Sequence, residues 1–388
     1  MDVVNIYKTI PKNISKKELI NELLTFFSDT PKTTSIIGNI LLNDLRQNKS
    51  INYVQLVELI GYLHQKSKEN EKISNTDKRK HFGIYYTPYS IARKLSNELL
   101  EGFKINEIIN KTFFEPCAGI GIFIIAYLDE IIQNYQLKDK EIIQEIINNI
   151  YYADIDPDAI ELLRIILPRY LKQKYEVNIK FKKDNCYIGN VLFDTSNQNI
   201  LKQDPIKLFN IKNKFDFILT NPPYRLLKVN SNKYEKDGSH NHYDEIKELL
   251  GFIRGNNIYK YNEGTLNYYK IFIEEILENY TTDKARVGLL IPNTLLNDKQ
   301  SSLLRQRILS SYHLNRLYTI PEKNVFFQDI SQAFCFFMLD KSKSTSSMEI
   351  INDVDSEEKL NNRGYQLELD TIRKTSDSFS IIITDSDG

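Results

Sequence analysis

The sequence has few cysteines and no long apolar run. Its three cysteines, Cys117, Cys186 and Cys335, lie far apart and form no CxxC pair. This spacing argues against a structural zinc site and indicates a reducing, cytoplasmic location. No apolar stretch approaches the roughly 18 residues that a bilayer-spanning helix needs. The first residues, MDVVNIYKTIPKN, lack the apolar core of a signal peptide. We therefore expect no membrane partner.

The sequence also lacks a net charge, because Lys+Arg and Asp+Glu both total 51. This balance excludes a uniformly basic nucleic-acid coat but leaves room for a local basic groove, since binding depends on where charge is placed. A hydrophobic content of 41% is typical of a folded globule rather than a disordered chain. The 388 residues fit one large domain with appendages.

The hydrophobic pattern divides the chain into three parts. Residues 1–78 have the apolar spacing of helices, as in KELINELLTFF, and we expect a helical segment there. Residues 79–342 alternate strand and helix patterns, which predicts an α/β domain with a mostly parallel sheet. Residues 343–388 begin within the polar stretch KSKSTSSMEIINDVDSEEKLNN, which we interpret as a linker before an incomplete C-terminal region. The expected strands are 111–115, 149–154, 178–183, 215–220, 286–292, 314–320 and 333–339.

Polar or small residues follow the first four expected strands, where open α/β sheets bind ligands. The small residues Ala118, Gly119 and Gly121 allow a ligand to approach the backbone at a helix start. Asp154 is placed to accept ribose hydroxyls, and Asp184 to accept an exocyclic adenine amine.

No phosphate clamp is evident, because CAGIGIF lacks the third glycine of GxGxxG and the Walker Lys-Ser/Thr pair is missing. These features favour S-adenosylmethionine over NAD or ATP. The alternative is that a lone acid at a strand end caps a helix, as we expect for Asp156 and Asp158. The four strand ends taken together favour the ligand site.

The fourth strand ends in Asn221-Pro222-Pro223-Tyr224. Two consecutive prolines cannot continue a ladder, since neither donates an N–H and each fixes φ. The chain therefore leaves the sheet rigidly, with an amide before the turn and an aromatic ring after it.

With these motifs the sequence resembles the gamma-class N6-adenine DNA methyltransferases over residues 79–342. The resemblance rests on FFEPCAGIGIF, YYADIDP, KKDNCYIGNVLF and FDFILTNPPY, with GIYYTPYSIARKL placed before them. It implies a Rossmann-like class I S-adenosylmethionine-dependent methyltransferase sheet, mostly parallel with an antiparallel edge strand. It also implies double-stranded DNA as partner and a role in a restriction-modification or defence system.

The resemblance assigns roles to residues at matching positions. Tyr86, Thr87 and Pro88 would lie near the methionine end of the cofactor, and Glu115 near its amino group. Asp154 would bind the ribose and Asp184 the adenine amine. Phe326, or its neighbour Phe327, would contact a flipped base. The expected cofactor site also includes the neighbouring residues Cys117, Ile155 and Asn185. Ordinary core packing is the alternative for Phe326.

The chemistry of the acceptor explains the Asn221 turn. An adenine amine is a poor nucleophile because its lone pair is delocalised into the ring. The Asn221 side-chain oxygen and the Pro222 carbonyl can each accept one amine proton and so direct the lone pair at the cofactor methyl. Tyr224 offers a stacking face worth about 1–3 kcal/mol to an extruded base. Cys117 lies in the cofactor turn, so we expect no covalent mechanism through its thiol.

Two other functions stay open at this point. The same fold could methylate cytosine N4, RNA or a protein glutamine, or the chain could be a catalytically silent DNA-binding subunit. The 46 residues after position 342 are too few for a target-recognition domain. We therefore expect either a truncated polypeptide or a separate specificity subunit, and a cognate restriction endonuclease is a further possible partner.

Overall fold

The fold is taken from a computed structural model. It describes residues 15–25, 52–70, 72–73, 76–77, 85–195, 199–228, 240–327, 330–342, 344–375 and 379–381. Most of the N-terminal segment outside its two main helices therefore falls outside the described residues. So do residues 229–239, which follow the Asn221 turn.

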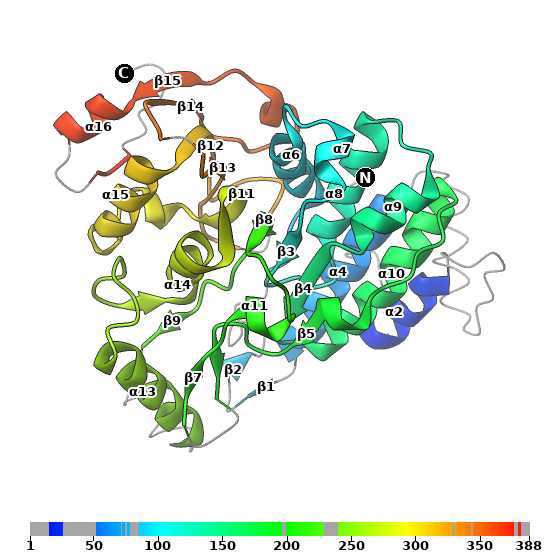
Figure 1. The fold of residues 1–388 in the computed structure, drawn as a ribbon. Coiled ribbons are helices and arrows are strands. Elements are labelled where there is room, and N and C mark those ends of the chain that lie inside the picture. The colour runs from blue at the N-terminus through cyan, green and yellow to red at the C-terminus, as the bar shows by residue number, and fades with distance from the viewer. Residues whose placement is uncertain are drawn as a thin grey trace.

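A nine-stranded sheet forms the centre of the molecule, with strand order β15-β14-β12-β13-β11-β8-β3-β4-β5. The pairs β5–β4, β4–β3, β3–β8, β8–β11 and β12–β14 are parallel, and the pairs involving β13 or β15 are antiparallel. This confirms the predicted mostly parallel sheet with antiparallel strands toward one edge (Figure 1). The strands are β3 (Phe113–Glu115), β4 (Ile150–Asp154), β5 (Cys186–Ile188), β8 (Phe215–Thr220), β11 (Thr281–Pro292), β12 (His313–Ile320), β13 (Phe334–Asp340), β14 (Ser347–Ile351) and β15 (Tyr365–Glu368).

Helices cover both faces of the sheet, which is why its central strands are continuous apolar runs. Figure 1 shows α4, α6, α8 and α10 on one side and α13, α14 and α15 on the other, each group with its own buried cluster. The helices are α2 (Lys16–Leu24), α4 (Tyr53–Asn70), α6 (Tyr89–Leu100), α7 (Ile105–Ile108), α8 (Ile122–Asn134), α9 (Lys140–Ile147), α10 (Pro157–Tyr175), α11 (Pro205–Leu208), α13 (His240–Gly255), α14 (Tyr268–Glu275), α15 (Ser302–Ser311) and α16 (Leu369–Thr375). Short two-residue strands form β1 (Lys72–Ile73), β2 (Thr76–Asp77), β6 (Phe193–Asp194), β7 (Leu201–Lys202), β9 (Leu226–Leu227) and β10 (Leu266–Asn267).

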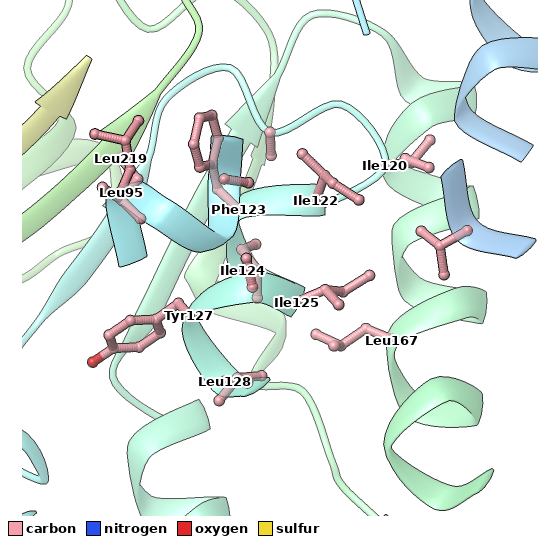
Figure 2. Packing of buried hydrophobic residues seen from close by; sticks show 14 of the residues in the cluster. Leu95, Ile120, Ile122, Phe123, Ile124, Ile125, Tyr127, Leu128, Leu167 and Leu219 are labelled. Carbon is pink, nitrogen blue, oxygen red and sulfur yellow. The ribbon is translucent and has the colours of Figure 1, made fainter. Parts of the chain in front are cut away.

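Helix α8 is the most buried helix of the core. Every residue from Ile122 to Ile132 is buried, and all of them except Asp129 and Glu130 are aliphatic or aromatic. Figure 2 shows its side chains among those of the neighbouring elements, with Leu95 of α6, Leu167 of α10 and Leu219 of β8. Because this helix is tightly packed, the position of the turn that precedes it is fixed.

A buried carboxylate ties α8 to two other helices. Asp129 of α8 accepts hydrogen bonds from the hydroxyls of Tyr89, Tyr170 and Tyr175 at 2.5, 2.6 and 2.7 Å. Lys174 lies 3.0 Å from the same carboxylate. A buried charge is tolerated only when it is paired and hydrogen-bonded, and Asp129 has both kinds of partner. The network holds α6, α8 and α10 together beneath the glycine turn.

The N-terminal helix α4 packs into the same core as the sheet. Val57, Leu59, Ile60 and Leu63 have exposed fractions of 0%, in one cluster with the residues of α8 and α10. The division of the chain at residues 78 and 342 stays a prediction, but α4 is not a detached appendage.

The strand predicted at 178–183 is wrong. Most of that stretch is exposed, and the Gln144 side chain of α9 bonds both the N–H and the carbonyl of Lys180, at 2.8 and 2.9 Å. These backbone groups are therefore not available to a ladder. The strand that pairs with β4 is instead β5, Cys186–Ile188.

The linker predicted after residue 342 is also wrong in part. Met348, Ile350 and Ile351 are buried in β14, which pairs in parallel with β12, and β15 then pairs with β14. The short run MEII, with three apolar residues, indicates this strand, but the polar composition of the surrounding stretch hides it.

Candidate functional site

The turn between β3 and α8 is shaped by two glycines. Gly119 and Gly121 have φ values of +52° and +85°, the left-handed region that glycine adopts without strain. A Cβ on Gly121 would also lie 2.8 Å from the Leu163 side chain of α10. The Gly119 N–H donates to Asp154 Oδ2 at 2.7 Å, which joins this turn to the end of β4. The predicted strand-end residues Gly119 and Asp154 are thus in direct contact.

A small cavity of about 70 Å³ lies under this turn. Glu115 lines it with an exposed fraction of 1%, and its Oε2 has no hydrogen-bond partner among the described residues. Burial, with Asp154 nearby, raises the pKa of Glu115 well above its usual value. A buried carboxyl oxygen without a partner is costly unless a ligand supplies a donor. The cavity is lined by Gly61, His64, Gln65, Tyr85, Tyr86, Thr87, Glu115, Cys117, Ala118, Gly119, Ile120, Ile122 and Asn221.

A second cavity of about 190 Å³ lies beside the first. Both cavities are lined by His64, Tyr85, Cys117, Gly119 and Asn221, so they adjoin at these residues. The second is also lined by Pro116, Asp154, Ile155, Asp156, Ala159, Gly189, Asn190, Val191, Pro223, Arg225, Tyr268 and Phe272. Asp154 is held there by the Gly119 N–H and by the Asp156 N–H at 2.8 Å, and burial raises its pKa.

The Asn221 amide has a fixed orientation. Its nitrogen donates to Thr87 Oγ1 at 3.0 Å and lies 3.4 Å from the Tyr85 carbonyl. Its oxygen accepts the Tyr224 hydroxyl. An amide oxygen can accept two hydrogen bonds, so one position remains for a substrate donor. Thr87, which is 6% exposed, therefore positions Asn221 as well as lining the small cavity.

The Tyr224 ring lies in an aromatic group. It stacks on Tyr85 with ring centroids 5.3 Å apart, and Phe334 and Tyr269 flank it at 5.5 and 6.4 Å. Tyr85 thus covers one of the two faces of the Tyr224 ring that a base could stack on. The role of Tyr224 toward a base stays a prediction.

The Cys117 thiol lines both cavities. Burial, with Asp154 nearby, raises its pKa well above the usual value, so the reactive thiolate is disfavoured. The expected absence of a covalent step through Cys117 stays a prediction.

Asp184 and Asn185 do not line either cavity. Because β5 begins at Cys186, Asp184 precedes the strand and is exposed, while Asn185 is buried and donates to the carbonyls of Asn148 and Ile150 at 2.9 and 3.0 Å. The carboxyl end of β5 instead carries Gly189 and Asn190, which line the larger cavity. The sequence signal for Asn190 was a Gly-polar pair directly after the apolar triplet CYI.

Tyr86, Pro88 and Phe326 line a third, open cavity of about 860 Å³ on the side of α4 and α6. Phe326 is half-buried there, whereas Phe327 is 4% exposed and packs on Phe334 at 4.3 Å. Both rings line this cavity, and Phe327 is the more deeply buried of the two. Of the remaining predicted residues, Ala118 lines the small cavity and Pro223 the larger one, while Gly121 and Pro222 shape the turns without lining either.

Sequence reasoning missed the contribution of α4. His64 Nε2 lies 3.0 Å from Asp156 Oδ2, and Lys68 Nζ lies 2.7 Å from Asp158. Burial disfavours the charged form of Asp156, but hydrogen bonds and charges of His64 and Lys68 lower its pKa to about 2. Asp156 also accepts from the Asp158 N–H, as predicted for a helix cap. No motif in residues 53–70 predicts these contacts.

Among the described residues, no group of three or more metal-ligating side chains could hold a metal ion. A search of the same residues found no helix both long and apolar enough to cross a membrane.

Comparisons with known proteins relate this chain to restriction-modification methyltransferases. Residues 148–326 match the model of the family described as Eco57I restriction-modification methylase. The type II methyltransferase M.AccI of Acinetobacter calcoaceticus is 27% identical over 261 residues, which cover 67% of this chain and 37% of that protein.

Solved structures share the fold. The cryo-EM structure of a DrdV–DNA complex matches with a TM-score of 0.62 and 14% identity, over 100% of this chain and 43% of that one. The ATP-dependent type ISP restriction-modification enzyme LlaBIII bound to DNA matches with a TM-score of 0.56 and 13% identity, over 89% of this chain and 27% of that one. The chain thus spans less than half the length of these three proteins.

The fold and the family match indicate S-adenosylmethionine as the cofactor, and polar groups that line the two adjoining cavities suit it. The unpartnered Glu115 oxygen is a ready acceptor for an ammonium group. Two acids, Glu115 and Asp154, suit a ligand with a net positive charge.

Proposed function

We propose that this chain is the catalytic part of a restriction-modification methyltransferase that transfers the methyl group of S-adenosylmethionine to the N6 amine of an adenine in double-stranded DNA. One observation carries the proposal: the two adjoining cavities share Asn221 in their lining, and contacts with Thr87 and Tyr224 hold its amide in one orientation. The cofactor supplies an electrophilic methyl group when bound.

The chain's own residues do the rest of the work by binding and orientation. Glu115 accepts from the cofactor ammonium and Asp154 from the ribose, which fixes the cofactor relative to Asn221. The Asn221 oxygen and the Pro222 carbonyl each accept a hydrogen bond from one amine N–H, which directs the nitrogen lone pair toward the methyl group. No general base is needed before attack.

Several features support an exocyclic base amine and DNA as the acceptor. An amide oxygen followed by two prolines presents two rigid acceptors, which match the two protons of an exocyclic amine. The DrdV and LlaBIII structures, by their descriptions, are DNA complexes. Because the chain spans less than half of its relatives, we further propose that recognition of the target sequence comes from additional protein, either a separate specificity subunit or a further domain.

The test is methyl transfer from labelled S-adenosylmethionine to DNA, RNA and protein, followed by nucleoside analysis. We expect label in N6-methyladenine of double-stranded DNA. Asn221→Ala should remove it, while Asn297→Ala, at an exposed position outside the cavities, should not. Label confined to N4-methylcytosine would reject adenine, and label confined to RNA or protein would reject DNA.

A further inference from the structure

The cofactor's own chemistry places a further demand on the small cavity. In S-adenosylmethionine the ammonium and carboxylate groups are attached to the same carbon. If Glu115 accepts from the ammonium, the carboxylate must therefore lie in or beside the same cavity of about 70 Å³. No arginine or lysine is among the described residues that line it. Uncharged donors and His64 are available to the carboxylate within the small cavity, while Arg225 lines the adjoining one.

Gln65 of α4 presents such a donor. Its side chain is 4% exposed and lines both the small cavity and the open cavity of about 860 Å³. Its Oε1 accepts the Tyr86 N–H at 2.6 Å, and because a main-chain N–H can only donate, this contact fixes which end of the amide is oxygen. The Nε2 group, with two N–H donors, has no hydrogen-bond partner among the described residues. An amide nitrogen without a partner, on a side chain that lines a cavity, is a site where an acceptor is expected.

Two other side-chain donors around this cavity are already engaged, whereas the Tyr86 hydroxyl is a further buried group without a hydrogen-bond partner among the described residues. The ring nitrogen Nε2 of His64 contacts Asp156 at 3.0 Å. The Asn221 nitrogen donates to Thr87 Oγ1 at 3.0 Å. Gln65 is brought close because Gly61, one turn earlier on α4, has no side chain: a Cβ there would lie 2.8 Å from the Tyr86 ring and 2.9 Å from Ile120.

We propose that Gln65 binds the carboxylate of the cofactor through its Nε2 group, so that helix α4 is part of the cofactor site. The proposal rests on the proposed function, since it takes S-adenosylmethionine as the ligand of these cavities. It assigns a binding role to a helix that lies outside the family match at residues 148–326.

The experiment compares two ligands on one variant by calorimetry. Gln65→Glu keeps an oxygen for the Tyr86 N–H but replaces the NH₂ donor with an oxygen that repels a carboxylate. We expect at least tenfold weaker binding of S-adenosylhomocysteine. Binding of 5′-deoxy-5′-methylthioadenosine, which has the same nucleoside and thioether but no amino acid, should change by less than twofold.

The matched control is Gln55→Glu, the same change on the same helix. Gln55 Oε1 accepts the Asn52 N–H at 3.0 Å, and the residue does not line the small cavity. This variant should bind both ligands as the wild type does.

The outcomes separate this inference from the function on which it rests. Unchanged S-adenosylhomocysteine binding by Gln65→Glu would overturn the inference. An equal loss of both ligands would also overturn it, because Gln65 would then act through the fold. A wild-type protein that binds no S-adenosylhomocysteine would overturn the proposed function itself, and the inference with it.

Discussion

The strand-end turns and helix α4 contribute to the same cavities by different means. The turns after β3, β4 and β8 are short, and each places one or two polar groups through backbone geometry: Glu115, Asp154 and Asn221. Helix α4 reaches the cavities from another part of the chain, through side chains on one face. A turn at the end of a buried strand can be recognised from local sequence, whereas the face of a helix acquires its role only from what it packs against.

Asn221→Ala should have the largest effect on activity. Removing one of two preorganised acceptors at the reacting amine should lower kcat by about 10²–10³-fold. Single-turnover methylation of DNA measures the loss, and calorimetry with S-adenosylhomocysteine should show little change. A kcat within threefold of the wild type would show that Asn221 takes no part in the reaction, and the proposed difference in role between the strand-end turns and α4 would then be wrong.

Glu115→Gln tests the strand-end side of the cofactor site. The amide keeps the shape of the carboxyl but loses the acceptor charge, so S-adenosylhomocysteine should bind about 10–100-fold more weakly. The unliganded variant should be at least as stable as the wild type, because the carboxyl oxygen it replaces is buried without a partner. Thermal unfolding checks the second expectation, and a large loss of stability would contradict it.

Asp156→Asn tests the link between α4 and the turn after β4. Partners on α4 lower the pKa of Asp156 from 3.8 to about 2, which corresponds to about 2 kcal/mol of folding free energy. For an acid with a lowered pKa, this stability is present above about pH 4 and is lost as the pH falls toward 2. Urea unfolding at several pH values should show a difference between wild type and variant that shrinks over this range. A difference independent of pH would contradict the assignment.

Gly61→Ala is expected to have the smallest effect, and it tests how closely α4 must approach. Alanine favours a helix interior by about 1 kcal/mol over glycine. At Gly61 the contact with Tyr86 should offset this gain and weaken cofactor binding several-fold. Gly251→Ala on α13 is the matched control, since a Cβ there meets nothing within 4 Å and should stabilise the protein. Identical behaviour of the two variants would show that α4 is not closely fitted to the cavity.

The sequence predicted those parts of the site that local chain chemistry determines. The apolar run of β8 followed by two prolines located Asn221, and the glycines before α8 located the first turn. The turn after the third expected strand was placed wrongly. The side chain of Gln144 forms hydrogen bonds with the backbone N–H and carbonyl of Lys180, and local sequence does not reveal this contact between distant residues. The residue at the true strand end, Asn190, was therefore overlooked. The roles of His64 and Gln65 could not be predicted, because nothing local marks the face of α4 that meets the cavities.

The Tyr85 ring on Tyr224 has a consequence for how a target would be chosen. On the proposed function, an arriving base would exchange one aromatic neighbour for another instead of covering a bare surface. The net gain from stacking would then be smaller than the roughly 1–3 kcal/mol of an open platform. Discrimination between bases would then depend mainly on the hydrogen-bond acceptors at Asn221 and Pro222. The protein would recognise the exocyclic amine of a base more than the stacking of its ring.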